Sequence, residues 1–216
     1  MAQRNLKCRA MFIAFEGPDG SGKSTQARLL AGYLAEQEVD YIAVREPGGT
    51  PAGDAIRQLL LEPNTVLTEL GEALLYAAAR AQLVQDVILP ALGRGTWVIS
   101  DRYLFSSLAY QGYGLGLDLE FVRDINLRAV QNRLPDLTFM LDAEPKLGIT
   151  RQQAQRGKLD RIEQRDLYFH QRVREGYQDL ARKHNLQTLG ASLGIEETHL
   201  AICRTIENKI REGAET

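Results

Sequence analysis

The chain has 216 residues, of which 44% are hydrophobic and 25% are charged. This is ordinary globular composition, which excludes intrinsic disorder, and the length predicts one domain spanning residues 1–216. Because the formal net charge is only −2, no global positive field attracts nucleic acid, and an anionic ligand must be held by a local cluster of cations. Small phosphorylated ligands are therefore expected rather than DNA.

The two ends of the chain carry no targeting or disulfide signal. Cys8 and Cys203 lie far apart and have no histidine at a metal-binding spacing, so we expect neither a disulfide framework nor a zinc site, and a reducing, cytoplasmic setting. Residues 1–10 are basic and polar, with no apolar run long enough for a signal peptide or a membrane span. They are predicted to be a flexible leader, and no membrane partner is expected.

Apolar runs bounded by turn residues alternate with amphipathic stretches, which predicts βαβ units around a mostly parallel sheet. The expected strands are Met11–Glu16, Tyr41–Arg45, Thr96–Asp101, Leu137–Asp142 and a shorter one at Leu186–Leu189. The expected helices are Lys23–Glu36, Ala52–Leu61, Thr68–Leu89, Leu119–Asn132, Glu144–Gln155, Gln164–His184 and Ile195–Glu212. The fold class is therefore three-layer α/β/α with a five-stranded parallel sheet, in which ligands bind beyond the carboxyl ends of the strands.

The helix from Thr68 has the clearest apolar periodicity. Its apolar residues recur at spacings of three and four and predict one buried stripe, formed by Leu70, Leu74, Ala77, Ala81, Val84 and Ile88. Pro90 is expected to end this helix, because proline removes a backbone donor.

A complete GxxxxGKS motif follows the first expected strand. It comprises Gly17, Pro18, Asp19, Gly20, Ser21, Gly22, Lys23 and Ser24, with Thr25 next in a helical pattern. Such a loop aims backbone N–H groups inward and adds the positive end of the helix, which together attract phosphate oxygens. Lys23 would reach the β- and γ-phosphates of ATP, and Ser24 would ligate Mg²⁺. A glycine-rich turn without a ligand is the alternative.

Two further strand ends offer charged residues. Asp101 ends the third strand and would hold the magnesium ion through water, while Arg102 beside it suits a second phosphate, which implies an acceptor nucleotide rather than water. Arg45 ends the second strand before a turn with Pro47 and two glycines, and would stand at the rim of that second phosphate site. A strand-terminal ion pair and a solvated arginine are the structural alternatives.

Other P-loop proteins fit less well. A guanine-specific switch usually carries an Asn-Lys-x-Asp motif, whereas Asn208-Lys209 is followed here by Ile210 and Arg211. A motor ATPase normally has a longer chain and a different strand motif. Another nucleoside monophosphate kinase, a deoxynucleoside kinase with an uncharged acceptor and a non-enzymatic nucleotide switch stay open as alternatives.

Over nearly its full length the chain resembles the thymidylate kinases of bacterial type. The ordered matches are FEGPDGSGKST from Phe15, REPGGT from Arg45, YAAAR from Tyr76, DRY with SSLAYQG from Asp101 to Gly112, and RGKLDRIE from Arg156. The resemblance implies a P-loop fold and transfer of the terminal phosphoryl group of ATP to thymidine monophosphate (dTMP), which supplies dTTP for DNA synthesis. It also implies a homodimer.

The resemblance further implies the residues of the dTMP site, namely Asp19, Arg45, Tyr76, Arg80, Arg102, Ser106, Tyr110 and Gln111. Arg45 and Arg102 would hold the 5′-phosphate, and Asp19 would accept from the 3′-hydroxyl of the sugar. The thymine would stack on Tyr76 and meet Arg80 and Gln111 at its edge. Tyr76 and Arg80 are four apart on a helix and can address one ligand, although Tyr76 also suits a boundary aromatic.

Residues 151–165 are expected to form a mobile, cation-bearing lid with Gly157 as a hinge. Phosphoryl transfer needs positive charge on the migrating group and exclusion of water. Some relatives carry an arginine inside the phosphate loop where this chain has Gly20, so the resemblance implies that the lid supplies this charge from Arg156, supported by Arg151 and Arg161. The expected catalytic residues are therefore Lys23, Asp101, Arg102 and Arg156. A solvated basic helix end is the alternative for the lid.

Overall fold

The computed structural model of the chain describes residues 10–157, 159–190 and 193–214, without the side chains of residues 155, 156, 213 and 214. The expected leader lies outside the described residues apart from residue 10. The described part contains a single five-stranded parallel sheet with the strand order β2-β3-β1-β4-β5. Its strands are β1 (Phe12–Glu16), β2 (Tyr41–Arg45), β3 (Trp97–Asp101), β4 (Leu137–Leu141) and β5 (Gln187–Leu189).

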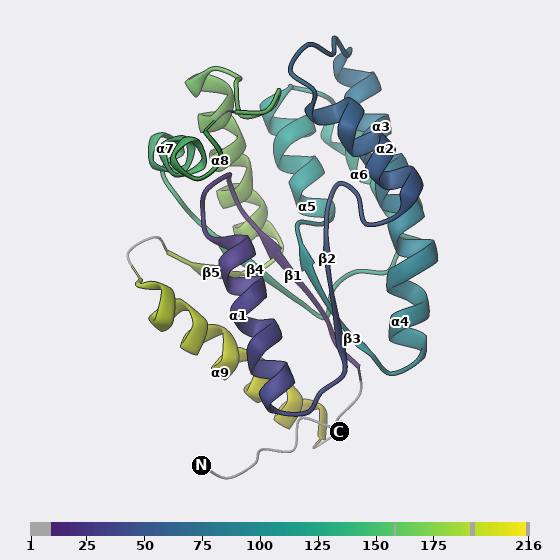
Figure 1. The fold of residues 1–216 in the computed structure, drawn as a ribbon, viewed down its shortest axis with the longest axis vertical. Coiled ribbons are helices and arrows are strands. Elements are labelled where there is room, and N and C mark those ends of the chain that lie inside the picture. Colours follow the sequence, from purple (N-terminus) through teal and green to yellow (C-terminus); the bar gives the residue numbers. More distant parts are fainter. Residues whose placement is uncertain (1–9, 158, 191–192, 215–216) are drawn as a thin grey trace.

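The helices lie on both faces of this sheet (Figure 1). They are α1 (Lys23–Glu36), α2 (Pro51–Leu61), α3 (Glu69–Leu83), α4 (Leu89–Gly93), α5 (Leu104–Ser107), α6 (Leu119–Ala129), α7 (Pro145–Arg156), α8 (Leu167–Lys183) and α9 (Ile195–Ala214), with the π-helical segments η1 (Val84–Ile88) and η2 (Leu108–Gly114). The predicted three-layer α/β/α fold class is confirmed, and the predicted strands differ from the observed ones by at most one residue at either end.

Each face of the sheet has its own hydrophobic core, because successive strand residues point to opposite sides. Phe12 and Ala14 of β1 pack into a core with residues of η1, η2, α6 and α8. Ile13 and Phe15 of the same strand pack into the other core, with α1 and α9. All five β1 residues are fully buried, so β1 holds the loop that follows it rigidly in place.

Two expectations about the long helical stretch are wrong. Pro90 does not end it, since the chain continues from α3 through η1 into α4 and stops at Gly93. A π-helical segment before a proline accommodates the missing backbone donor without ending the helix. The stripe is wrong in its first turns, since Leu70 is 49% exposed and Leu74 is 47% exposed.

The buried side of α3 is instead made of small and charged residues. Ala73, Ala77 and Leu83 are buried together with Glu72 and Arg80. The two charged side chains are buried because each meets partners of opposite charge, which offsets the cost of removing them from water. Hydrophobic periodicity cannot register such partners, and so it assigned the leucines to the core.

Among the residues that the structure describes, none of the helices is both long enough and apolar enough to cross a membrane.

Candidate active site

The phosphate loop connects β1 to α1 at the carboxyl edge of the sheet, as expected for a ligand site in an open parallel sheet. Gly20 has a φ of +70°, and a Cβ there would lie 2.5 Å from backbone atoms of Gly148. In the reverse direction, a Cβ on Gly148 would lie 2.1 Å from the carbonyl oxygen of Asp19. Helix α7 therefore packs directly against the loop, and both positions require glycine.

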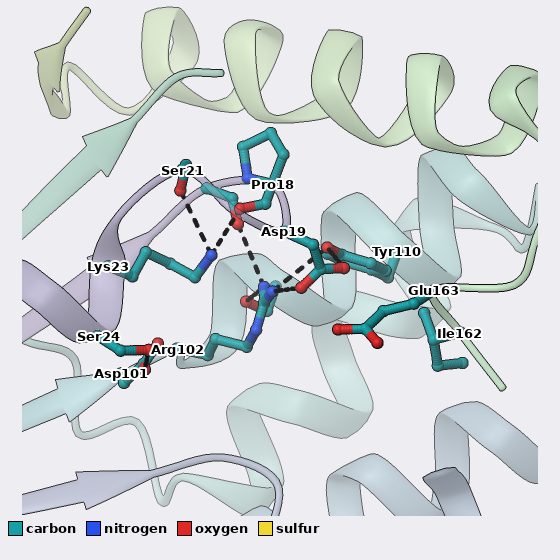
Figure 2. A network of polar contacts seen from close by, with 12 residues as sticks. Pro18, Asp19, Ser21, Lys23, Ser24, Asp101, Arg102, Tyr110, Ile162 and Glu163 are labelled. Carbon is teal, nitrogen blue, oxygen red and sulfur yellow. Dashed lines mark hydrogen bonds and ion pairs between the residues drawn. The ribbon is translucent and has the colours of Figure 1, made fainter. Parts of the chain in front are cut away.

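Lys23 is buried at the start of α1 and points back at the loop (Figure 2). Its ammonium group donates to the Pro18 carbonyl oxygen at 2.6 Å and lies 3.4 Å from Ser21 Oγ. Burial and the neighbouring positive charge of Arg102 lower the pKa of Lys23 to about 7. An anion bound in the loop would restore the charged form.

Ser24 and Asp101 meet between the start of α1 and the end of β3. The Ser24 hydroxyl donates to Asp101 Oδ2 at 2.5 Å, and both residues line the pocket over the loop. A hydroxyl and a carboxylate are hard oxygen donors of the kind that Mg²⁺ prefers, and Mg²⁺ usually takes only one or two protein ligands beside phosphate and water. The described residues contain no larger cluster of acidic, histidine or cysteine side chains suited to a metal, so this pair fits Mg²⁺ bound together with phosphates.

Arg102 lies at the centre of the site (Figure 2). Its Nη2 donates to Asp19 Oδ1 at 2.5 Å and to the Tyr110 hydroxyl at 3.3 Å. Its Nη1 donates to Gly17 O, Ser106 Oγ and the Tyr177 hydroxyl, each at 3.2 Å. The backbone of Arg102 has a φ of +78°, a conformation that costs free energy for a non-glycine residue and persists where surrounding contacts hold it.

Asp19 is held in its charged form by these neighbours. Burial opposes the charge, but Arg102, Lys23 and a 2.7 Å hydrogen bond from Tyr110 outweigh it, and the pKa of Asp19 falls to about 2. The guanidinium of Arg102 is thus paired with a permanent anion at the junction between the loop and the neighbouring pocket.

Glu16 positions Arg102 indirectly, through residues that contact both. The end of β1 places its carboxylate where it accepts from the backbone N–H groups of Tyr103 and Ser106, from Ser106 Oγ at 2.6 Å and from the Tyr177 hydroxyl. Burial raises the pKa of Glu16 to about 7, although the hydrogen bond from Ser106 works against this rise. Ser106 and Tyr177 both contact Arg102, so Glu16 fixes two of its partners.

Two pockets open at this edge of the sheet. The first lies over the loop and α1 and is also lined by Arg151, Leu189 and Ile195. The second lies beside it and is lined by Tyr76, Arg80, Ser106, Tyr110 and Gln111, among others. Asp19, Arg45 and Arg102 line both pockets. All eight residues expected in the dTMP site are therefore brought together around the second pocket.

Arg45 lies at the rim between the two pockets. Its side chain is 46% exposed, and its Nε lies 4.0 Å from Asp101 Oδ2. This weak, solvent-screened contact leaves the guanidinium available to a ligand. Tyr76 of α3 is half-buried in the wall of the second pocket.

Arg80 is buried in the wall of the second pocket with all its donors directed at protein acceptors. Nε and Nη2 contact Glu46 Oε2, Nη1 donates to Ser107 and Asn126, and Nη2 also donates to the Tyr103 carbonyl. A base edge would have to replace one of these acceptors. Glu46 Oε1 is buried without a hydrogen-bond partner among the described residues, and burial raises the pKa of this carboxyl.

The expected lid arginines are placed differently from one another. Arg151 of α7 donates to the Gly20 carbonyl at 3.1 Å and faces the phosphate loop. Gly157 ends α7 with a φ of +74°, which is the conformation that favours glycine at a helix end. The side chain of Arg156 lies outside the described residues. Arg161 is not brought to the loop, because it donates to the Leu60 carbonyl and to Glu72 on the far side of the second pocket.

The fold and the site together define the class of the protein. A glycine loop between β1 and α1, a carboxylate at the end of β3 and a second, arginine-lined pocket form a P-loop nucleotide-binding site with room for a second anion. Comparison with known proteins gives the family. The family model described as thymidylate kinase matches residues 15–202.

Curated relatives and a solved structure agree with this match. The thymidylate kinase of Carboxydothermus hydrogenoformans is 47% identical over 88% of this chain and 93% of its own length. That of an Exiguobacterium species is 50% identical over 81% and 82% of the two chains. The crystal structure of thymidylate kinase from Ehrlichia chaffeensis matches with a TM-score of 0.74 at 34% identity, over 92% of this chain and 99% of that one. The chain belongs to the thymidylate kinase family.

The sequence analysis missed several residues that build the site, chiefly Glu16, Glu46, Glu72, Ser107, Asn126, Gly148 and Tyr177. Most become visible only in three dimensions, because their partners are far away in the chain. Glu72 did carry a signal, since it precedes Tyr76 and Arg80 at spacings of four on the same helix, which puts all three on one side.

Proposed function

We propose that the chain transfers the γ-phosphoryl group of ATP to the 5′-phosphate of dTMP, giving ADP and dTDP. It is a transferase of the kinase class, and its product is the precursor of dTTP in both de novo and salvage synthesis. The observation that carries this proposal is that Asp19, Arg45 and Arg102 line both pockets. Phosphoryl transfer needs the donor and acceptor phosphates side by side and in line, and shared lining residues provide that arrangement.

In the proposed reaction the loop N–H groups and Lys23 hold the β- and γ-phosphates, while Arg45 and Arg102 hold the phosphate of dTMP. An oxygen of the dTMP phosphate forms a bond to the γ-phosphorus, and the bond from that phosphorus to the β,γ-bridging oxygen breaks, so that ADP leaves. Arg102 already spans the junction through Asp19 and Gly17. We assign to Arg156, supported by Arg151, the positive charge that stabilises the migrating group.

Ser24 and Asp101 are the residues that we propose to hold Mg²⁺. Mg²⁺ held there would neutralise part of the negative charge of the ATP phosphates. Lys23 and Arg102 line the same pocket as Ser24 and Asp101. Their positive charges would add to that of Mg²⁺ in neutralising the two phosphates.

The base is proposed to lie against Tyr76, with Gln111 at its edge. Tyr110 donates to Asp19 and would line the sugar, whose 3′-hydroxyl would donate to the other side of that carboxylate. Arg80 would donate to the edge of the base only if one of its present hydrogen bonds to a protein acceptor were broken. Ser107, a pocket residue whose hydroxyl can rotate, is the most readily exchanged of them.

We also propose a cytoplasmic homodimer. Leu70 and Leu74 are four apart on α3 and both are about half exposed, and Leu59 on the neighbouring α2 is 43% exposed. Leu70 and Leu74 lie on the same side of α3, and exposed apolar side chains grouped in this way mark an interface, which a second copy would cover. Leu74→Glu should shift the chain from dimer to monomer in analytical ultracentrifugation, and a monomeric wild type would contradict the proposal.

An acceptor panel tests the proposed reaction. Purified chain with Mg-ATP would be given dTMP, uridine monophosphate, deoxyguanosine monophosphate or thymidine, and ADP and the phosphorylated product would be quantified. The proposal expects rapid, dTMP-dependent formation of dTDP. Preference for thymidine would indicate a deoxynucleoside kinase. Nucleotide exchange without acceptor-dependent ADP formation would indicate a switch.

A further inference from the structure

Glu72 is a buried carboxylate that contacts Gln111, a lining residue of the second pocket, called here the acceptor pocket. It is not among the residues proposed to bind phosphate. Its side chain is 1% exposed. Oε1 accepts from Gln111 Nε2 at 3.0 Å, and Oε2 accepts from Arg161 Nη2 at 2.8 Å and Arg165 Nη2 at 3.0 Å. A carboxylate paired with two guanidinium groups can only accept hydrogen bonds.

This contact fixes which way the Gln111 side chain faces. A side-chain amide has an NH₂ group that donates and a carbonyl oxygen that accepts, and the two ends are interchangeable in shape. Beside an acceptor-only carboxylate, the NH₂ end must face Glu72. The carbonyl oxygen is therefore turned away from Glu72, and in the described part of the chain no donor is paired with it. Gln111 is 2% exposed and lines the acceptor pocket.

We propose that Glu72 sets the pyrimidine specificity of the acceptor site by orienting Gln111, an inference that rests on the proposed dTMP site. The Gln111 carbonyl then accepts from the N3–H group of thymine. Cytosine has an unprotonated N3 that only accepts, so in the same position two acceptors would face each other. Sites built to receive a substrate donor reject analogues that lack it, because the protein group is left unpaired. Glu72 is thus a positioning residue that acts through Gln111.

Through its two arginine partners, Glu72 also connects Gln111 to the segment between α7 and α8. Arg161 and Arg165 belong to this segment, and Arg161 further donates to the Leu60 carbonyl at 2.7 Å and through its backbone to the Leu61 carbonyl at 3.2 Å. The segment therefore lies docked on the end of α2 and on α3. Glu72 thus holds Arg161 and Arg165 in this docked arrangement and, by the same carboxylate, holds the Gln111 amide in one orientation.

The test is the ratio of kcat/KM for dTMP to kcat/KM for deoxycytidine monophosphate, measured with Mg-ATP in wild type and variants. Where turnover of the second acceptor is too slow, its inhibition constant against dTMP replaces its kcat/KM. In Glu72→Gln the new side chain can donate as well as accept, so Gln111 is free to turn, and the ratio should fall about tenfold or more. A partial loss of folded protein lowers both rates equally and leaves the ratio unchanged.

Three further variants separate positioning from support of the fold. Glu69→Gln makes the same change three residues earlier on the exposed side of α3 and should keep the wild-type ratio. Glu72→Asp retains the carboxylate and should therefore keep most of the wild-type ratio, even if Glu72→Gln folds poorly. In a Gln111→Ala background, Glu72→Gln should change the ratio no further, because the residue through which it acts is gone.

The proposal is overturned if Glu72→Gln loses activity while the ratio stays at the wild-type value. It is also overturned if Glu72→Gln lowers the ratio as much in the Gln111→Ala background as in wild type. These outcomes are distinct from failure of the proposed function, which would appear as absence of dTDP formation by the wild-type chain.

Discussion

The phosphate loop and the acceptor pocket are both proposed to bind anions, but they are built differently. The loop consists of residues 17–25 in one run, and its main contribution is backbone geometry plus Lys23. The acceptor pocket collects side chains from the ends of β2 and β3, from α3, from η2 and from residues 160–163. A local motif therefore defines the first site, whereas the whole fold defines the second. Substitutions and changes of pH should therefore affect ATP binding at the loop and dTMP binding in the pocket differently.

The largest effect is expected for Arg156, the proposed source of positive charge on the migrating phosphoryl group. Arg156→Ala should lower turnover by on the order of 10³ to 10⁵, by analogy with arginine fingers, while dTMP binding weakens far less. Steady-state kinetics with both substrates varied would measure this, with the exposed Arg128→Ala as a control. If turnover survives while both apparent affinities collapse, Arg156 is a binding residue instead.

The two sites should differ in their pH dependence. The pKa of Lys23 in the free protein is about 7, and bound phosphates favour its charged form. Below pH 7 Lys23 is already protonated. Above pH 7 binding must take up a proton, so kcat/KM for ATP should fall about tenfold per pH unit. The pKa of Asp19 is about 2, so Asp19 adds no such dependence to dTMP binding.

The profile would be measured from pH 7.5 to 9.5, where ATP itself is fully ionised. Lys23→Arg keeps its charge throughout this range and should flatten the ATP profile, whatever its absolute rate. A decline of equal steepness in Lys23→Arg would show that another group titrates.

On the acceptor side, the exposed Arg45 is a clean probe, because removing it disturbs little of the protein. Arg45→Ala should weaken dTMP binding about tenfold or more, since a charge-assisted contact is lost, and should leave thymidine binding unchanged. Isothermal titration with both ligands measures the difference, with Arg28→Ala on the exposed side of α1 as the matched control. Equal weakening for thymidine would mean that Arg45 does not bind the phosphate.

The smallest expected effects concern two helical glycines and the stability of the fold. Gly148→Ala would place a Cβ 2.1 Å from Asp19 O and should lower the free energy of unfolding by about 1–3 kcal/mol. Gly32→Ala in α1 has open space around the new Cβ and should raise it by about 0.4–1 kcal/mol. Urea unfolding measures both. An equal change in the free energy of unfolding for the two variants would show that α7 moves away from the loop to accommodate the new Cβ.

The same contrast explains what could be predicted from sequence. The loop and the strands before it were predictable because their signals are contiguous, in a buried apolar run, a glycine motif and a helix start. Arg45 and Arg102 were found because strand ends of a parallel sheet share one edge. The buried face of α3 was predicted wrongly, because Glu72 and Arg80 are buried only by virtue of Arg161, Glu46 and other distant partners.

Contacts between remote segments set the rest of the site. Nothing near Gly148 in the sequence indicates that it touches Asp19, and nothing near Arg161 indicates that it binds Glu72 rather than the loop. The residue types of the site were thus largely foreseeable from the family resemblance, while the network that orients them was not.

The proposed reaction requires that the two phosphate sites face each other across Arg102. Its most direct test is the affinity of adenosine and thymidine joined through their 5′-oxygens by a polyphosphate chain, measured by calorimetry. A ligand that spans both sites should bind at least a hundredfold more tightly than ATP or dTMP alone, and both Lys23→Ala and Arg45→Ala should weaken it. Binding no tighter than that of the better single nucleotide, or sensitivity to only one of the two substitutions, would contradict this arrangement of the two sites.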